Sequence, residues 1–192
     1  MSSVDSVLEY AESLIGVPYR WWNTGDTIDA DDKFWANNGG FVNRDSIDEN
    51  DSCIVCTGLI NLMRRYLGLS IPGLDGTLGK TGLKFPGTTY TWFRYLSKKG
   101  WLEPYSNYES YPRGTLLIRN YKNVHDQGHV AVFINETQII HACSDYTYSE
   151  SIELGLVDVG STKIDDFEDI HSWSGGNYFT HICRPDYWLV NF

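Results

Sequence analysis

Apolar side chains recur at helical spacing in three stretches of the first half of the chain. Residues 4–15 and 55–67 each carry an apolar face, and residues 88–99 carry an aromatic one. Spacings of three and four residues place such side chains on one side of a helix. Gly68 and Gly100 follow the second and third stretches, and glycine suits the end of a helix. We therefore expect three helices in this half.

The second half is patterned differently, because short β-type runs replace the long helical ones after Pro112. Asn135 and Glu136 suit a two-residue turn that would pair two neighbouring runs as a hairpin. Helices first and strands later indicate an α+β domain whose sheet is antiparallel. The expected strands are residues 115–119, 129–135, 138–143, 152–159 and 178–183.

Length and composition favour a single folded domain over residues 1–192. The hydrophobic content of 42% and the aromatic content of 15% can fill a sizeable core. A net charge of -10 argues against a nucleic-acid partner, which selects a basic face. No apolar run approaches the roughly 18 residues of a membrane span, so we expect none. The oligomeric state is left open.

The N-terminus indicates where the chain is made. Residues 1–6 show no basic region followed by an apolar core, so we expect no conventional secretory signal. Four cysteines are too few for a disulfide scaffold. We expect synthesis in the cytoplasm, with release by an unconventional route left open.

Residues 23–51 form an acidic insertion between the first two predicted helices. The segment carries eight acidic side chains together with Trp35 and Phe41. Such aromatics favour an ordered loop packed on the domain, and a lid over the site is the sharper interpretation. An acidic wall would favour neutral or amine-bearing substrates.

Cys56 opens the apolar part of the second helix, and Thr57 and Gly58 keep its first turn small. A helix N-terminus stabilises a thiolate, and its backbone N–H groups can bind an oxyanion. We expect these effects to lower the pKa of Cys56. The plain alternative is a buried structural cysteine.

Cys53 and Cys56 also form a C-x-x-C pair, so a redox dithiol or half of a zinc site must be weighed. A zinc site would need further ligands, and no second C-x-x-C occurs. Cys143 and Cys183 stand alone in the sequence. The pattern therefore predicts no metal site.

Two histidines lie at the end of the predicted hairpin away from its turn. His129 starts one strand and His141 lies near the end of its partner, so pairing brings them close. One thiol and two imidazoles suit a nucleophile, a base and a group that orients the base. Whether the two rings share a face depends on the strand register. His125 is the alternative base, and His171 and His181 are expected to be structural.

Six ordered segments resemble the NlpC/P60 superfamily of papain-like cysteine peptidases. The family's Gly-x-Pro-Tyr-x-Trp segment, its Cys-Ser-Gly-Leu-Val nucleophile motif and the strand that carries its base all have counterparts here. Two positions depart from the family pattern, because Val55 and Thr115 replace the usual aspartates. The matching segments are residues 16–21, 56–60, 113–117, 128–134, 140–142 and 183–185.

The resemblance implies a papain-like α+β domain with the nucleophile helix packed on an antiparallel sheet. It implies amide hydrolysis through a thioester, with Cys56 as nucleophile, His129 as base, His141 as its orienting partner and Tyr19 lining the site. No metal or organic cofactor is implied. The implied substrate is a peptidoglycan stem peptide or a related small peptide. A deamidase, an acyltransferase, a lipid or small-molecule amidase, and an inactive binding module stay open as alternatives.

Overall fold

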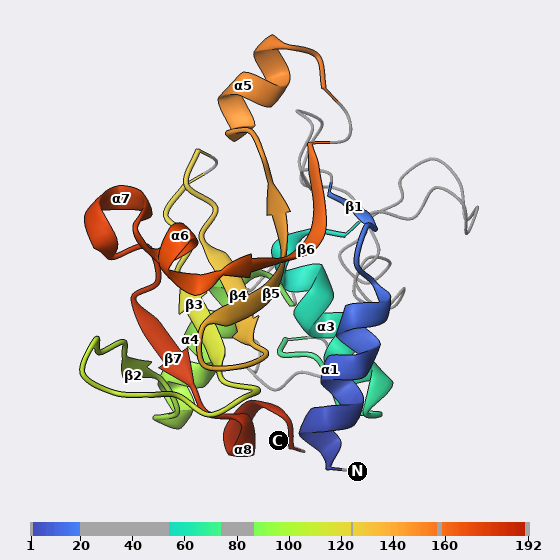
Figure 1. Ribbon diagram of the computed structural model, residues 1–192, viewed down its shortest axis with the longest axis vertical. Coiled ribbons are helices and arrows are strands. Elements are labelled where there is room, and N and C mark those ends of the chain that lie inside the picture. The colour runs from blue at the N-terminus through green and yellow to red at the C-terminus, as the bar shows by residue number, and fades with distance from the viewer. Residues whose placement is uncertain (1, 20–53, 74–86, 124, 157–158, 191–192) are drawn as a thin grey trace.

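Seven strands form one antiparallel sheet in the order β1-β6-β5-β4-β3-β7-β2. The computed structural model describes residues 2–19, 54–73, 87–123, 125–156 and 159–190 (Figure 1). The strands are β1 (Pro18–Tyr19), β2 (Glu103–Pro104), β3 (Leu116–Arg119), β4 (His129–Phe133), β5 (Gln138–Ser144), β6 (Gly160–Asp166) and β7 (His181–Cys183). The helices are α1 (Ser3–Ser13), α3 (Cys56–Tyr66), α4 (Thr89–Lys99), α5 (Tyr148–Glu153), α6 (Phe167–His171), α7 (Trp173–Gly176) and α8 (Pro185–Trp188). The predicted α+β class is confirmed.

The three predicted N-terminal helices are present as α1, α3 and α4. In α4 the side chain of Thr88 caps the N-terminus by accepting from the Thr91 N–H, and Gly100 ends the helix with φ +71°. Only glycine adopts that left-handed conformation without strain, which explains the stop. Helix α3 begins at Cys56 and has no side-chain cap, because its N-cap residue is Val55.

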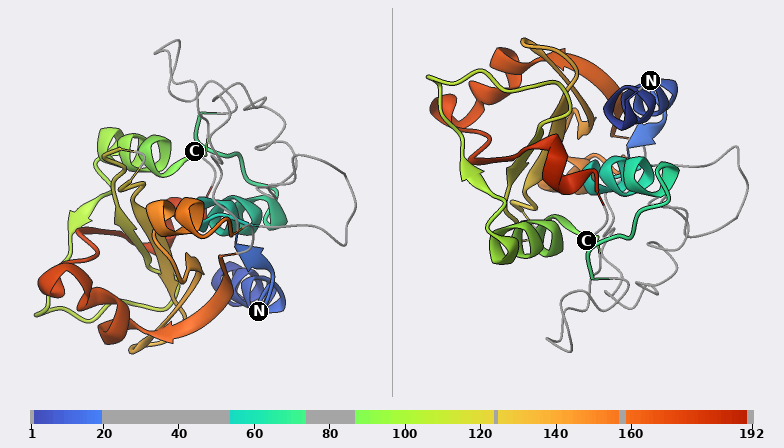
Figure 2. Two further views of the ribbon diagram at one scale, coloured as in Figure 1. Left: turned by 90° about the horizontal axis from the view of Figure 1, so that it is seen from above. Right: turned by 90° about the horizontal axis from the view of Figure 1, so that it is seen from below.

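The two faces of the sheet carry different cores. One face packs Ile118, Val130, Val132 and Ile140 against α1, α3 and α4. The other face carries a smaller, aromatic cluster that includes Phe133, Phe167, Phe179 and Tyr111. Figure 2 shows α1 and α3 on one side of the sheet and α6 on the other.

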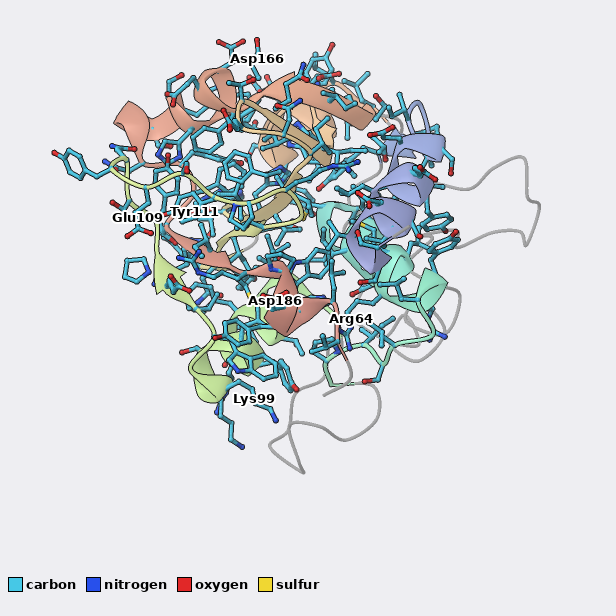
Figure 3. The ribbon with its side chains drawn as sticks, turned by 60° about the horizontal axis from the view of Figure 1, so that its bottom comes forward. Arg64, Lys99, Glu109, Tyr111, Asp166 and Asp186 are labelled. Carbon is cyan, nitrogen blue, oxygen red and sulfur yellow. The ribbon has the colours of Figure 1, made fainter. Side chains whose placement is uncertain are left out.

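Arg64 ties the nucleophile helix to the C-terminal segment. Its side chain is fully buried and donates hydrogen bonds to the backbone carbonyls of Ser70, Trp188 and Val190. Figure 3 shows Arg64 beside the C-terminal helix α8. A buried guanidinium is tolerated when carbonyl oxygens accept its protons, so these bonds fix the far end of α3.

The predicted strand at residues 152–159 is wrong. Residues 148–153 form helix α5 instead, because Thr147 and Glu150 make a capping box at its start. The true strand is β6, which pairs with β5 through seven residue pairs. Its sequence is mainly polar, and Thr162 is its one buried side chain, so it lacks the apolar alternation that predicts a strand.

No helix in the described part of the chain is both long and apolar enough to cross a bilayer.

Candidate active site

Tyr19 and Cys56 are brought together by the segment that leads into α3. The backbone N–H of Ile54 donates to the Pro18 carbonyl at 2.9 Å, and Tyr19 forms a bridge with Ile54. On its other side β1 pairs with β6. The Tyr19 hydroxyl oxygen accepts from the backbone N–H of Cys56, and burial raises the pKa of Tyr19 well above its usual value. Tyr19 is therefore a neutral phenol at the N-terminus of α3.

The turn between β4 and β5 decides which way the two histidines face. It has three residues rather than the predicted two, because the Ile134 N–H donates to the Gln138 carbonyl and Asn135 accepts from the Thr137 and Gln138 N–H groups. The register pairs Val132 with Ile140. Odd-numbered residues of β4 and β5 therefore lie on one face of the sheet, and His129 and His141 are both on that face.

His129, His141 and Asp165 form a hydrogen-bonded chain, here named the histidine relay. His129 Nε2 lies 2.9 Å from His141 Nδ1, and His141 Nε2 lies 2.9 Å from Asp165 Oδ2. Both histidines are buried, whereas the Asp165 side chain is 30% exposed. The predicted approach of His129 and His141 across the hairpin is confirmed.

The carboxylate sets the tautomers of both rings. The hydrogen bond from His141 and the charge of Lys163 hold the pKa of Asp165 below its usual value, so it is an anion that only accepts. His141 must then carry its proton on Nε2 and accept on Nδ1, and His129 must donate from Nε2. Burial, together with the charges of His141, Arg119 and Lys163, lowers the pKa of His129 well below its usual value. Neutral His129 therefore keeps its lone pair on Nδ1.

The Cys56 thiol at the start of α3 lies against the start of β4, where it accepts from the backbone N–H of Val130. Val130 directly follows His129, the candidate base. Burial raises the pKa of Cys56, and four neighbours act in the opposite direction: the Thr89 hydroxyl, the backbone N–H groups of Thr57 and Val130, and the charge of Arg119. Its Sγ lies 3.9 Å from Thr89 Oγ1. The expectation of a lowered pKa is wrong, because Cys56 is buried, with 7% of the residue exposed, and desolvation outweighs the helix N-terminus.

Arg119 connects the thiol to the relay. It is the cross-strand partner of His129, so the two side chains share a face. Its guanidinium lies 4.4 Å from the centre of the Tyr178 ring and forms an ion pair with Asp126. The sequence gives no sign of this arrangement, because β3, the loop after it and the Tyr178 segment meet only in the folded chain.

Gly128 allows the close packing beside the thiol. Its φ is +75°, and a Cβ there would overlap the Arg119 carbonyl oxygen and lie 2.7 Å from Thr89 Cγ2. Only glycine fits this position. The glycine thereby lets Thr89 reach both the turn before β4 and the Cys56 sulfur.

A second thiol that the sequence left isolated belongs to the same site. One ring nitrogen of His129, one of His141 and the Sγ of Cys143 all lie within 4.8 Å of one another. The signal that could have found Cys143 is the i, i+2 spacing from His141, which puts both side chains on one face of a strand.

The remaining histidines lie away from this site. His125 is exposed and contacts Ser149 at 3.1 Å, so it is not placed as a base. His171 packs among aromatic rings and accepts from the Phe179 N–H, and His181 packs against Phe93. Cys53 and the acidic segment at residues 23–51 lie outside the described residues, so of the predicted C-x-x-C pair only Cys56 is described.

Searches with sequence alone place the chain in no group: no protein-family model and no curated protein matches it. Solved structures do match. The chain is similar to an NlpC/P60 family protein from Bacillus cereus ATCC 10987, with 13% identity, a TM-score of 0.49, and coverage of 94% of this chain and 39% of that one.

Two proteins from Mycobacterium tuberculosis are also similar. The peptidoglycan hydrolase RipB shows 17% identity and a TM-score of 0.45, over 95% of this chain and 64% of RipB. RipD, described as a non-catalytic NlpC/p60 domain protein adapted to peptidoglycan binding, shows 16% identity and a TM-score of 0.46, over 96% and 98%. The structural match thus spans nearly the whole chain at low identity. Likeness at this level does not decide activity, so function has to be argued from the side chains.

Proposed function

We propose that this chain is a cysteine hydrolase that cleaves an amide bond through a thioester intermediate. The observation that carries the proposal is the histidine relay, whose free base nitrogen belongs to a strand that adjoins the thiol at the N-terminus of α3. A base oriented by a second group beside a thiol is the arrangement that nucleophilic catalysis requires.

The reaction begins with a neutral thiol. Because the pKa of Cys56 is raised and that of His129 is lowered, no thiolate–imidazolium pair forms at rest. His129 Nδ1 takes the proton as the sulfur attacks the carbonyl carbon, and the imidazolium that forms donates through Nε2 to His141. The relay with Asp165 stabilises that charge.

The oxyanion of the tetrahedral intermediate would lie at the first turn of α3. The backbone N–H groups there and the neutral Tyr19 hydroxyl are donors of the required kind. His129 then protonates the leaving amine, and the thioester remains on Cys56. Water, deprotonated by His129, attacks the thioester and restores the thiol.

For the substrate we propose a peptidoglycan stem peptide or a related small peptide, on the strength of the sequence motifs shared with the NlpC/P60 superfamily. A second function has an observation of its own. The small exposed fraction of Cys56 and its raised pKa also suit a binding module that keeps the fold without turnover. Assays must separate the two.

The test is to incubate the purified protein with a panel of peptidoglycan fragments and small peptides and to identify products by mass spectrometry. The wild type should release an amine product, and Cys56→Ala should release none because the acyl acceptor is gone. Cys183→Ala is the matched control, since Cys183 is a buried thiol on β7 that donates to the backbone carbonyl of Arg184. Fragment binding without products in the wild type would favour the binding module instead.

A further inference from the structure

The second thiol and the two rings of the relay share a geometry that the hydrolase mechanism does not use. Cys143, His129 and His141 are all buried, and their ligand atoms lie within 4.8 Å of one another. In the described part of the chain these are the residues that gather three atoms able to ligate a metal. Two imidazole nitrogens and one thiolate are donors that zinc prefers.

We propose that Cys143, His129 and His141 form a zinc-binding site that overlaps the catalytic relay. Tetrahedral zinc places its nitrogen and sulfur ligands about 3.3–3.6 Å apart. The two ring nitrogens that face each other are 2.9 Å apart, and all three ligand atoms lie within 4.8 Å of one another, so small side-chain rotations that separate the nitrogens would let one zinc ion bind all three.

Asp165 supplies the outer contact that such a site needs. Histidines that bind metals commonly donate their other ring N–H to a carboxylate, which fixes the ring and raises the basicity of the ligating nitrogen. His141 Nε2 makes this contact with Asp165 at 2.9 Å, which leaves Nδ1 directed at His129 and available to the metal.

The charges around Cys143 favour a cation. The carboxylates of Asp165 and Asp145 act on Cys143 as negative charges, and the charge of Lys163 partly offsets them. Zinc binding forms a Zn–S bond, releases the thiol proton to solvent, and replaces the hydrogen bond between His129 and His141. His129 then carries its proton on Nδ1.

Zinc would thus occupy His129 Nε2 and His141 Nδ1, and His129 Nδ1 would no longer be a base. The consequence is reversible inhibition of the hydrolase, and this consequence alone rests on the proposed function. Metal binding stands on the geometry of three side chains and can be measured without any substrate.

The experiment uses cobalt(II) as a spectroscopic probe and zinc as its competitor on chelator-treated full-length protein. The wild type should bind about one cobalt with a thiolate-to-cobalt charge-transfer band and the intense visible bands of tetrahedral coordination, and zinc should abolish both. Cys143→Ser should lose the charge-transfer band, whereas Cys56→Ser and the control Cys183→Ser should keep it. Asp165→Asn should weaken zinc binding about 10- to 100-fold.

A second measurement needs no variant. In the wild type, zinc should slow the alkylation of Cys143 by N-ethylmaleimide, read by mass spectrometry, without changing that of Cys183. A charge-transfer band that survives in Cys143→Ser, or that disappears in Cys56→Ser, would overturn the proposed site. Unchanged Cys143 alkylation would do the same. Cobalt binding in a protein that hydrolyses nothing would leave the site standing and remove only the proposed function.

Discussion

The first turn of α3 and the end of β5 each bring a buried cysteine to the same site. The two thiols differ in the hydrogen-bonding groups and charges that surround them. Donors surround Cys56: two backbone N–H groups, a hydroxyl and the charge of Arg119. Cys143 lies mainly among acceptors: its thiol donates to the Ser144 carbonyl, and the carboxylates of Asp145 and Asp165 act on it against the charge of Lys163.

This difference assigns the two thiols different chemistry. A thiolate on Cys56 finds donors already in place, so a nearby base is enough to form it. A thiolate on Cys143 meets two carboxylates, which the single charge of Lys163 offsets only in part. On the proposals above, similar burial of the same residue type suits a nucleophile in one region and a metal ligand in the other, because the neighbours decide which charge state is stabilised.

The largest effect is expected for His129→Ala. Without the base, the Cys56 proton has no acceptor within the relay, and kcat should fall about 10²- to 10⁴-fold. Steady-state kinetics on the best substrate of the panel would measure it, with circular dichroism to confirm folding. His171→Ala is the control, a buried histidine outside the relay. Full activity of a folded His129→Ala protein would show that the donors around Cys56 suffice without this base.

Asp165→Asn should come next, with a loss of about 10²-fold or more in kcat. The asparagine amide can donate to His141 Nε2, which reverses both tautomers and puts a proton on His129 Nδ1. Asp145→Asn is the matched control, because Asp145 contacts Lys163 at 2.6 Å without touching the relay. A positioning role predicts a changed pH profile of kcat in Asp165→Asn. Identical profiles in the two variants would contradict it.

Thiol alkylation tests the comparison directly and should differ by about 10-fold or more between the two cysteines. Because the pKa of Cys56 is raised from 9.0, its thiolate forms only above the usual range, and its iodoacetamide labelling should keep rising above pH 9. Labelling of Cys143, whose pKa is about 12, should lag behind at every pH. Peptide mass spectrometry would resolve them. Faster labelling of Cys143 would reverse the assignment.

The smallest effect is expected for Gly128→Ala, which should lower the free energy of unfolding by about 1–3 kcal/mol. A methyl group there meets the Arg119 carbonyl and Thr89. Gly155→Ala is the control, since Gly155 also has a positive φ of +65° but has nothing within 4 Å of a Cβ. Urea unfolding would compare them. Equal losses would mean that backbone conformation, and not crowding beside the thiol, explains the cost.

The sequence by itself determined the local elements and the parts of the site that lie on them. The apolar faces that end at Gly68 and Gly100 predicted α3 and α4, and the hairpin brought His129 and His141 together. These features follow from short-range rules, because helix periodicity, end signals and strand pairing are properties of neighbouring residues. Tyr19 and Cys56 came from motifs of the same local kind.

The tertiary structure decided the rest. One extra residue in the turn after Phe133 set the register that puts both histidines on one face. Polar β6, which no apolar pattern predicts, carries Asp165 to the relay, and the fold brings Cys143 to the rings of His129 and His141. Burial also reversed the expected pKa of Cys56. Each of these depends on contacts between distant segments and on desolvation, which residue spacing along the chain does not encode.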